Sequence, residues 1–432
     1  MFFKYLILLN ILFSLIYSYK ILVVNPKFGY SHVNFFSQVA DILTEAGHNI
    51  TVLAIDLDPT IKHPGAYKAK VITYQATKEV KDNFANTLDK KFLWTLSNSG
   101  AQQFKLALKF MDGILKQSLR VFNDKELSEK IKREKFDLGI TETMNVYIFG
   151  LFKVWGIKAH VAGFSMSLGP KTPKMVEVSG IGIKDPKPLD EYWHKILSLR
   201  NKTVLVSFGS FAKAIYMPDE MKNGLLETIK KLNDITFIWK YEEPGDGTGK
   251  DIENLIISKW LPQSDLLNDE RLSLFVTHGG MGSTTELSFR GVPAIAIPIL
   301  GDQMRNSKLI ERQKCGIVMN KFELADSSKL IKNIKTILDD DSYKTNAKMV
   351  SKRLNKRPIG SKRLLIEHIE FAAEFGRLDM LDLASRNMNM IEYYNLDIIF
   401  PVIFGLFILL TLILYLIFKV VKKLFKPKAK ID

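Results

Sequence analysis

The stretch from Trp260 to Gln303 decides the fold of this chain; it reads WLPQSDLLNDERLSLFVTHGGMGSTTELSFRGVPAIAIPILGDQ. Residues 274–276 have the apolar character of a short buried strand, and residues 277–280 form a turn with almost no side-chain bulk. A helix is expected from about Ser283 to Gly291, and a second apolar strand from Ala294 to Ile299. A strand, a glycine turn and a helix start bring free backbone N–H groups and the positive end of the helix dipole to one spot. The stretch therefore predicts an anion site that a diphosphate fits.

The rest of the chain alternates strands and helices in the same manner. Strands are expected at residues 21–24, 49–55, 71–74, 136–140, 159–164, 203–207, 236–240 and 255–257, with helices between them, among them 32–46, 146–155 and 217–232. Apolar strands that alternate with helices indicate doubly wound parallel sheets. With 432 residues, of which 47% are hydrophobic, the chain can bury the cores of two domains. We therefore expect an α/β protein.

The Trp260–Gln303 stretch resembles the donor-binding signature of the UDP-glycosyltransferase family, which includes the UDP-glucuronosyltransferases. The Trp-Leu-Pro-Gln start, the His-Gly-Gly turn, the Glu and the Asp-Gln end follow one another at the spacing of that family. The resemblance implies a GT-B fold, in which two Rossmann-like domains face each other across a cleft. It places an acceptor-binding domain at residues 19–169, a UDP-sugar-binding domain at 170–378 and a return helix at 379–397, where the chain crosses back onto the first domain.

The resemblance assigns the donor site to the second domain. Trp260 and Gln263 match the positions that meet the uracil ring, although a tryptophan beside a proline is more often a core residue. The remaining donor-binding positions are His278 and Gly280 in the diphosphate turn, Ser210 in a Ser-Phe-Gly-Ser turn, and Asp302 and Gln303, with Asn306 assisting, at the sugar hydroxyls. The co-substrate is a UDP-sugar, and neither a metal nor another cofactor is implied.

Ser283 and Glu286 have two interpretations. Their Ser-Thr-Thr-Glu spacing is that of a capping box, in which both side chains satisfy backbone N–H groups at a helix start. In the family, the matching glutamate binds the ribose hydroxyls, and the position of Ser283 lies beside the phosphates. We favour ribose binding for Glu286 and regard Ser283 as partly a cap.

The first domain supplies the expected catalytic base. His32 follows the first strand and the turn Gly29-Tyr30-Ser31, and it matches the family's base, which takes a proton from the acceptor hydroxyl. Glu142 stands where many family members have an aspartate, which orients the base and stabilises its charged form. Without the resemblance, His32 would be interpreted as an ordinary polar residue at a helix start.

Both ends of the chain carry membrane-targeting patterns. Residues 1–18 have an early lysine and then an apolar run, which is typical of a cleaved signal peptide; an uncleaved anchor is the alternative. Residues 398–418 contain no charged residue and are long enough to span a bilayer, which needs about 20 residues. The lysine-rich tail at 419–432 predicts a cytosolic C-terminus and lumenal domains. Lys428 and Lys430 resemble a dilysine retrieval signal, so a single-pass type I protein of the endoplasmic reticulum membrane is expected.

The net charge and the cysteine count bear on two further properties, nucleic-acid binding and disulfide formation. The net charge is +15, but no zinc-finger or RNA-binding motif is present and six lysines lie in the tail, so a nucleic-acid partner is not expected. Cys315 is the only cysteine, which excludes an intrachain disulfide.

Two functions stay open from the sequence. The first is an inverting glycosyltransferase that moves glucuronic acid or a hexose from a UDP-sugar to a hydroxyl of a small lipophilic acceptor, an activity typical of detoxification. The second is an inactive UDP-sugar-binding or regulatory protein that associates with full-length relatives. Homo-oligomers and hetero-oligomers both stay open for either function. The second hypothesis arises because residues 169–175 lead almost directly into the second domain, where family members carry a long helical stretch beside the acceptor pocket.

Overall fold

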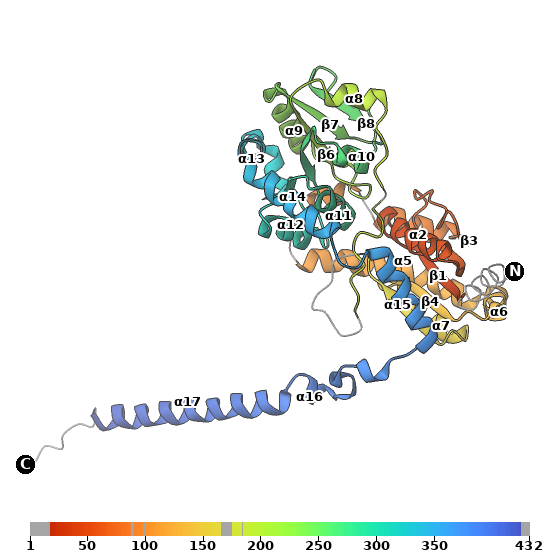
Figure 1. Ribbon diagram of the computed structural model, residues 1–432. Helices are drawn as coiled ribbons and strands as arrows, with labels where there is room; N and C mark the ends of the chain where they lie inside the picture. Colours follow the sequence, from red (N-terminus) through yellow and green to blue (C-terminus); the bar gives the residue numbers. More distant parts are fainter. Residues whose placement is uncertain (1–17, 88–89, 98–99, 166–174, 184, 425–432) are drawn as a thin grey trace, which may run out of the picture. The chain divides into compact units, whose positions relative to one another are not determined.

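The computed structural model describes residues 18–87, 90–97, 100–165, 175–183 and 185–424 (Figure 1). The segment up to residue 17, where a signal peptide is expected, the junction at 169–174 and the end of the lysine-rich tail lie outside these residues. The contacts divide the chain into a large unit that ends at Arg377 and a C-terminal unit that begins at Leu378.

The large unit begins with a five-stranded parallel sheet in the order β3-β2-β1-β4-β5. Its strands are β1 (Lys20–Lys27), β2 (Asn49–Asp56), β3 (Lys70–Tyr74), β4 (Leu138–Glu142) and β5 (Ala159–Gly163). The helices of this part are α2 (Tyr30–Glu45), α3 (Lys78–Thr87), α4 (Lys90–Thr95), α5 (Gly100–Asn123), α6 (Lys125–Glu134) and α7 (Tyr147–Val154).

Both faces of this sheet are covered, as the continuous apolar run of β1 requires. Ile21 and Val23 pack in one core cluster with residues of α2, whereas Leu22 and Val24 pack in another with residues of α5, α6 and α7. Successive strand residues point to opposite faces, so these two clusters are the two sides of one sheet.

A six-stranded parallel sheet forms the second part, in the order β11-β10-β9-β6-β7-β8. Its strands are β6 (Lys202–Ser207), β7 (Ile235–Lys240), β8 (Leu255–Ser258), β9 (Leu272–Thr277), β10 (Ala294–Ala296) and β11 (Gly316–Val318). Its helices are α8 (Glu191–Leu197), α9 (Asp219–Lys231), α10 (Gln263–Asn268), α11 (Met281–Arg290), α12 (Gln303–Arg312), α13 (Ser327–Asp339), α14 (Asp341–Asn355) and α15 (Ser361–Phe375). In chain order this is the 3-2-1-4-5-6 arrangement of a Rossmann sheet, and β6 and β9 flank the point where the order reverses.

A segment of the first part is built into the core of the second. Trp94 of α4 is fully buried in the cluster that contains Val204 and Val206 of β6. Its indole N–H donates to the carbonyl of Lys213 over 3.0 Å. This indole therefore fastens α4 to the second sheet.

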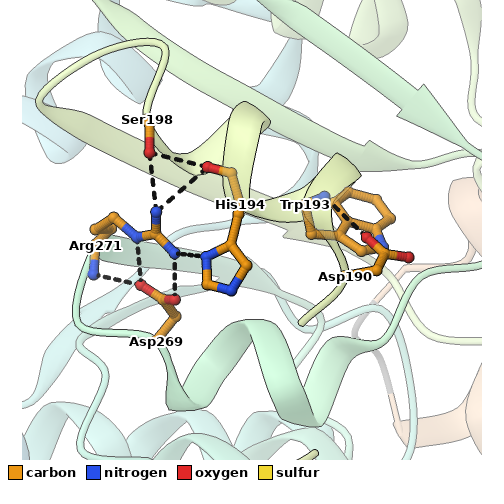
Figure 2. A network of polar contacts seen from close by, with 6 residues as sticks. All are labelled: Asp190, Trp193, His194, Ser198, Asp269 and Arg271. Atoms are coloured by element: carbon orange, nitrogen blue, oxygen red, sulfur yellow. Dashed lines mark hydrogen bonds and ion pairs between the residues drawn. The ribbon is translucent and has the colours of Figure 1, made fainter. Parts of the chain in front are cut away.

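A polar network ties α8 to the start of β9 (Figure 2). The Arg271 guanidinium binds both carboxylate oxygens of Asp269, at 2.8 and 2.7 Å, and also reaches Ser198 Oγ at 2.9 Å. It lies 2.8 Å from Nδ1 of His194 as well. Arg271 immediately precedes β9, so this network lies at the amino end of the strand, away from the turn that follows Thr277.

The C-terminal unit contains η3 (Asp379–Leu381), η4 (Ala384–Asn387), α16 (Met390–Tyr393) and α17 (Leu396–Leu424). The expected return helix at 379–397 is therefore wrong as a single helix, because the described chain makes only short turns before α17. Gly376, with a φ of 64°, ends α15 in a conformation that L-residues seldom adopt. Within the large unit, α15 contacts the first sheet: its Leu365 and Ile369 pack in the same cluster as Ile21 and Val23 of β1.

Residues 396–422 of α17 are long and apolar enough to cross a membrane by length and composition. The expected span at 398–418 lies inside this helix. Elsewhere the predicted elements are confirmed with shifts of up to three residues: β1 ends at Lys27 and not at residue 24, and β10 ends at Ala296 and not at Ile299.

Candidate functional site

His32 lies in the first turn of α2, directly after the central strand β1. Gly29 precedes the helix in extended backbone, and a Cβ there would stand 3.2 Å from the His32 ring. The ring packs against Phe28 with centroids 4.6 Å apart. The sheet and this packing therefore fix the imidazole at the carboxyl end of β1.

Glu142 and Ser165 reach the same imidazole from the two neighbouring strands. Glu142 is the last residue of β4, and its Oε2 lies 3.0 Å from His32 Nδ1. Ser165 follows the end of β5; its Oγ lies 2.5 Å from His32 Nδ1 and donates to Glu142 Oε2 over 2.7 Å. Glu142 is buried and the His32 side chain is 17% exposed, so the ring keeps access to solvent on one side. The predicted pairing of His32 with Glu142 is thus present, and Ser165 was missed because it depends on β5 lying beside β4.

The turns after β6 and β9 meet where the order of the second sheet reverses. A Cβ on Gly209 would stand 2.7 Å from the His278 ring, and a Cβ on Gly280 would stand 2.4 Å from its Nε2. Gly209 also has a φ of 79°. Only glycine permits this close approach without strain, so the glycines bring the turn that contains Ser210 against the imidazole.

The environment of His278 keeps its ring neutral. Burial lowers the pKa of His278 to about 4, and the positive charge of Lys240 lowers it as well, while a backbone hydrogen bond with Ser207 acts in the opposite direction. Nδ1 of His278 is buried and makes no hydrogen bond within the described part of the chain. A buried polar atom of this kind is costly unless a ligand completes it.

The N-terminus of α11 lies in the same place. The helix begins at Met281 with Gly280 as its N-cap, and no side chain among the described residues caps it. The first backbone N–H groups of a helix have no partner within it, so this end of α11 has the chemistry to bind an anion. The capping box predicted for Ser283 and Glu286 is therefore wrong, because Ser283 lies inside the first turn and not before it.

Ser283 and Glu286 are instead joined by Gln263. The Gln263 amide donates to Glu286 Oε2 over 2.6 Å and lies 3.3 Å from Ser283 Oγ. Gln263 begins α10, and the other two side chains belong to α11. Three of the side chains predicted from the sequence thus form one polar cluster.

Asp302, Gln303 and Asn306 lie at the start of α12. The Asn306 amide donates to Gly279 O over 3.0 Å and to Asp302 Oδ2 over 2.9 Å, so it ties the His-Gly-Gly turn to Asp302. The amide oxygen of Gln303 accepts the N–H groups of Ile299 and Leu300 at 2.8 and 3.0 Å. The oxygen of Gln303 is thus used to shape the loop.

Trp260 is 61% exposed, so it is not a core residue. Its ring lies 5.8 Å from Tyr30, near the start of α2, and 5.9 Å from the Lys240 ammonium. Lys240 also donates to Gly209 O over 2.8 Å and pairs with Glu242 at 3.0 Å. Sequence reasoning missed Lys240; its place at the end of β7 was the only available signal.

The chain matches one family model and several known proteins. The family model described as UDP-glucoronosyl and UDP-glucosyl transferase matches residues 19–150 and 148–431. The chain is 36% identical over 204 residues to the putative UDP-glucuronosyltransferase ugt-56 of Caenorhabditis elegans, a match that covers 46% of this chain and 39% of that protein. It is 24% identical over 500 residues to the putative UDP-glucuronosyltransferase ugt-47 of the same organism, a match that covers 93% of each. That aligned length exceeds the 432 residues of this chain, so the relative has residues that this chain lacks.

Solved structures show the same fold. Spinosyn rhamnosyltransferase SpnG has a TM-score of 0.61 at 14% identity, covering 81% of this chain and 100% of that one. The glycotransferase of kitacinnamycin has a TM-score of 0.57 at 16% identity, covering 82% and 99%. The expected GT-B class, with two parallel α/β sheets and one apolar C-terminal helix, is confirmed.

Proposed function

Since the chain belongs to the UDP-glucuronosyl and UDP-glucosyl transferase family, we propose that it is an inverting glycosyltransferase that uses a UDP-sugar. The sugar is glucuronic acid or a hexose, and it passes to a hydroxyl of a small lipophilic acceptor. The observation that carries the proposal is the imidazole of His32, which is backed by Glu142 at 3.0 Å on one side and open to solvent on the other.

The proposed reaction follows from the hydrogen bonds of His32. When Nδ1 carries the proton, it can donate a hydrogen bond to Glu142 Oε2, and the lone pair of the ring is on Nε2. Nε2 takes the proton of the acceptor hydroxyl while that oxygen forms a bond to the anomeric carbon. The bond from this carbon to the diphosphate oxygen breaks on the opposite face, UDP leaves with the electron pair, and the configuration is inverted. Glu142 balances the charge of the imidazolium.

The second domain is proposed to hold the donor. The free N–H groups of α11 and the imidazole of His278 face the diphosphate, where interactions that strengthen as UDP gains charge stabilise the transition state. We propose that Trp260 stacks on the uracil, that Gln263 and Glu286 bind uracil and ribose, and that Asp302 and Gln303 hold the sugar. Ser210 and Ser283 contribute hydroxyls beside the phosphates. No metal is needed in this scheme.

The anchoring helix suits acceptors that partition into lipid. We propose that α17 holds the protein in the endoplasmic reticulum membrane with both sheets in the lumen. A protease applied to sealed microsomes should then remove an epitope at residue 432 without detergent and spare the sheets. Protection of that epitope would reverse the proposed orientation.

The test of the activity compares His32→Ala with His368→Ala in the full-length chain. His368 is an exposed histidine on α15 whose Nδ1 contacts the carbonyl of Leu364, so it serves as a matched control. Radiolabelled UDP-sugars and a panel of phenols and sterols should yield a product that disappears in His32→Ala and persists in His368→Ala. Donor binding without any product would instead support the regulatory alternative.

A further inference from the structure

Ser165 lies between the two members of the base pair. The distances are 2.5 Å from its Oγ to His32 Nδ1, 2.7 Å from Oγ to Glu142 Oε2 and 3.0 Å from Nδ1 to Oε2. The serine oxygen is thus closer to the ring than the carboxylate is. The three atoms form a closed triangle in which every edge is within hydrogen-bond distance.

The number of available protons decides which atom donates each hydrogen bond in this triangle. An ionised carboxylate only accepts, so the hydroxyl of Ser165 donates to Glu142 Oε2. Nδ1 of His32 then has two oxygen atoms as neighbours, Ser165 Oγ and Glu142 Oε2. Both oxygens can accept a hydrogen bond from Nδ1 when this nitrogen carries the proton. In that tautomer the lone pair is on Nε2, which is the arrangement that a base needs to accept a proton there.

Ser165 is also the second donor that this carboxylate needs. The Glu142 side chain is buried, and its Oε1 has no hydrogen bond within the described residues. The hydrogen bonds of the carboxylate among the described residues are therefore made by Oε2, which accepts from Ser165 and His32. Hydrogen bonds to an ionised group are roughly twice as strong as neutral ones.

The backbone is shaped to bring Ser165 to this place. Gly163 ends β5, and a Cβ there would lie 2.6 Å from the ring of Phe36, which is one helical turn after His32 on α2. Glycine at this position lets the end of β5 approach α2. The next residues of the chain then carry the Ser165 hydroxyl to the imidazole.

We propose that Ser165 is a positioning residue of this glycosyltransferase, the third member of a relay in which the His32 Nδ1–H is shared between Ser165 Oγ and Glu142 Oε2, and Ser165 donates to Glu142 Oε2. The inference rests on the proposed function, because it concerns the same base. Ser165 touches neither donor nor acceptor in this scheme. It fixes the tautomer and orientation of His32 and keeps the carboxylate hydrogen-bonded while the imidazolium forms.

The kinetic test uses Ser165→Ala, Ser165→Thr and a matched control in the full-length chain. Thr143→Val is the control, because Thr143 lies at the same sheet edge and donates to the carbonyl of Gly163 at 2.6 Å instead. Ser165→Ala should lower kcat by about 10- to 100-fold, the range for one hydrogen bond to a charged group, with KM for the UDP-sugar unchanged. Ser165→Thr should restore most of the rate, and Thr143→Val should leave kcat near wild type.

A double variant shows whether Ser165 acts through the base. In the His32→Ala background, Ser165→Ala should produce no additional loss of the residual rate. A kcat within twofold of wild type for Ser165→Ala would overturn the proposal. An equal loss with and without His32 would also overturn it, as would a loss that Ser165→Thr does not restore.

A spectroscopic readout separates failure of the relay from failure of the proposed activity. In full-length protein labelled with ¹⁵N-histidine, the signal missing in His32→Ala identifies the His32 ring. Its Nδ1–H proton should resonate far downfield and move upfield in Ser165→Ala. If no acceptor yields product but this shift is seen, the relay stands and the activity fails; an unchanged signal overturns the relay whatever the activity.

Discussion

The low pKa of His278 makes a defined contribution to the pH dependence of stability. Burial and the nearby Lys240 lower the pKa of this ring to about 4 in the folded chain, whereas an unfolded histidine titrates near 6.5. Between these pH values the unfolded chain binds a proton that the folded chain does not. The free energy of unfolding therefore falls as the pH is lowered from about 6.5 to about 4. Below about pH 4 this group causes no further decrease.

The size of the effect follows from the shift. A difference of about 2.5 pKa units at about 1.4 kcal/mol per unit gives a loss of about 3 kcal/mol. His278 as a whole residue is half-buried although its ring is shielded from water, so this value is an upper limit. His278→Asn replaces the imidazole with a side chain that does not titrate, and it should remove this part of the pH dependence.

The assay is denaturant unfolding of the full-length chain in detergent, followed by tryptophan fluorescence at pH values from 7 to 4. The measured quantity is the free energy of unfolding of His278→Asn minus that of wild type at each pH, with His368→Asn as the exposed-histidine control. The difference should move in favour of His278→Asn by up to about 3 kcal/mol as the pH falls. A difference that stays constant over this range would refute the assignment of a buried, neutral imidazole.

Three further outcomes are expected. Gly209→Ala should weaken UDP binding at least about 10-fold, because the new methyl group would lie 2.7 Å from the His278 ring at a φ of 79°; unchanged affinity in a titration would contradict this packing. Trp94→Ala should lower the free energy of unfolding by about 3–5 kcal/mol, since a fully buried indole is removed from the second core, and a loss below about 1 kcal/mol would argue against the insertion of α4. Dialysis against EDTA should leave the transfer rate unchanged, and a rate restored only by added divalent cation would exclude the metal-free scheme.

The local signals of the sequence predicted the strand, the glycine turn and the helix of residues 272–290 well. A strand that ends in Thr277-His278-Gly279-Gly280 before a helix has few alternatives, because glycines at positive φ and free N–H groups belong to such turns. The start of the helix was harder to predict. Ser283 has the chemistry of a cap, but Gly280 takes that position, since the helix begins as soon as the glycine turn ends.

Contacts that depend on strand order could not be predicted. Ser165 and Glu142 are 23 residues apart, and they meet only because β4 and β5 are neighbours in the sheet. The role of the Gln303 amide oxygen likewise depends on how residues 299–300 turn after β10. The chemistry of these side chains is visible in the sequence, whereas their partners are set by tertiary structure.

Binding of uridine diphosphate to full-length, folded protein tests the central claim most directly. Isothermal titration with UDP should give a saturable, single-site heat with a Kd below about 1 mM, equivalent to at least about 4 kcal/mol, and His278→Asn should weaken it. An absence of heat at millimolar UDP, from protein whose unfolding is cooperative, would contradict the nucleotide pocket and the account built on it.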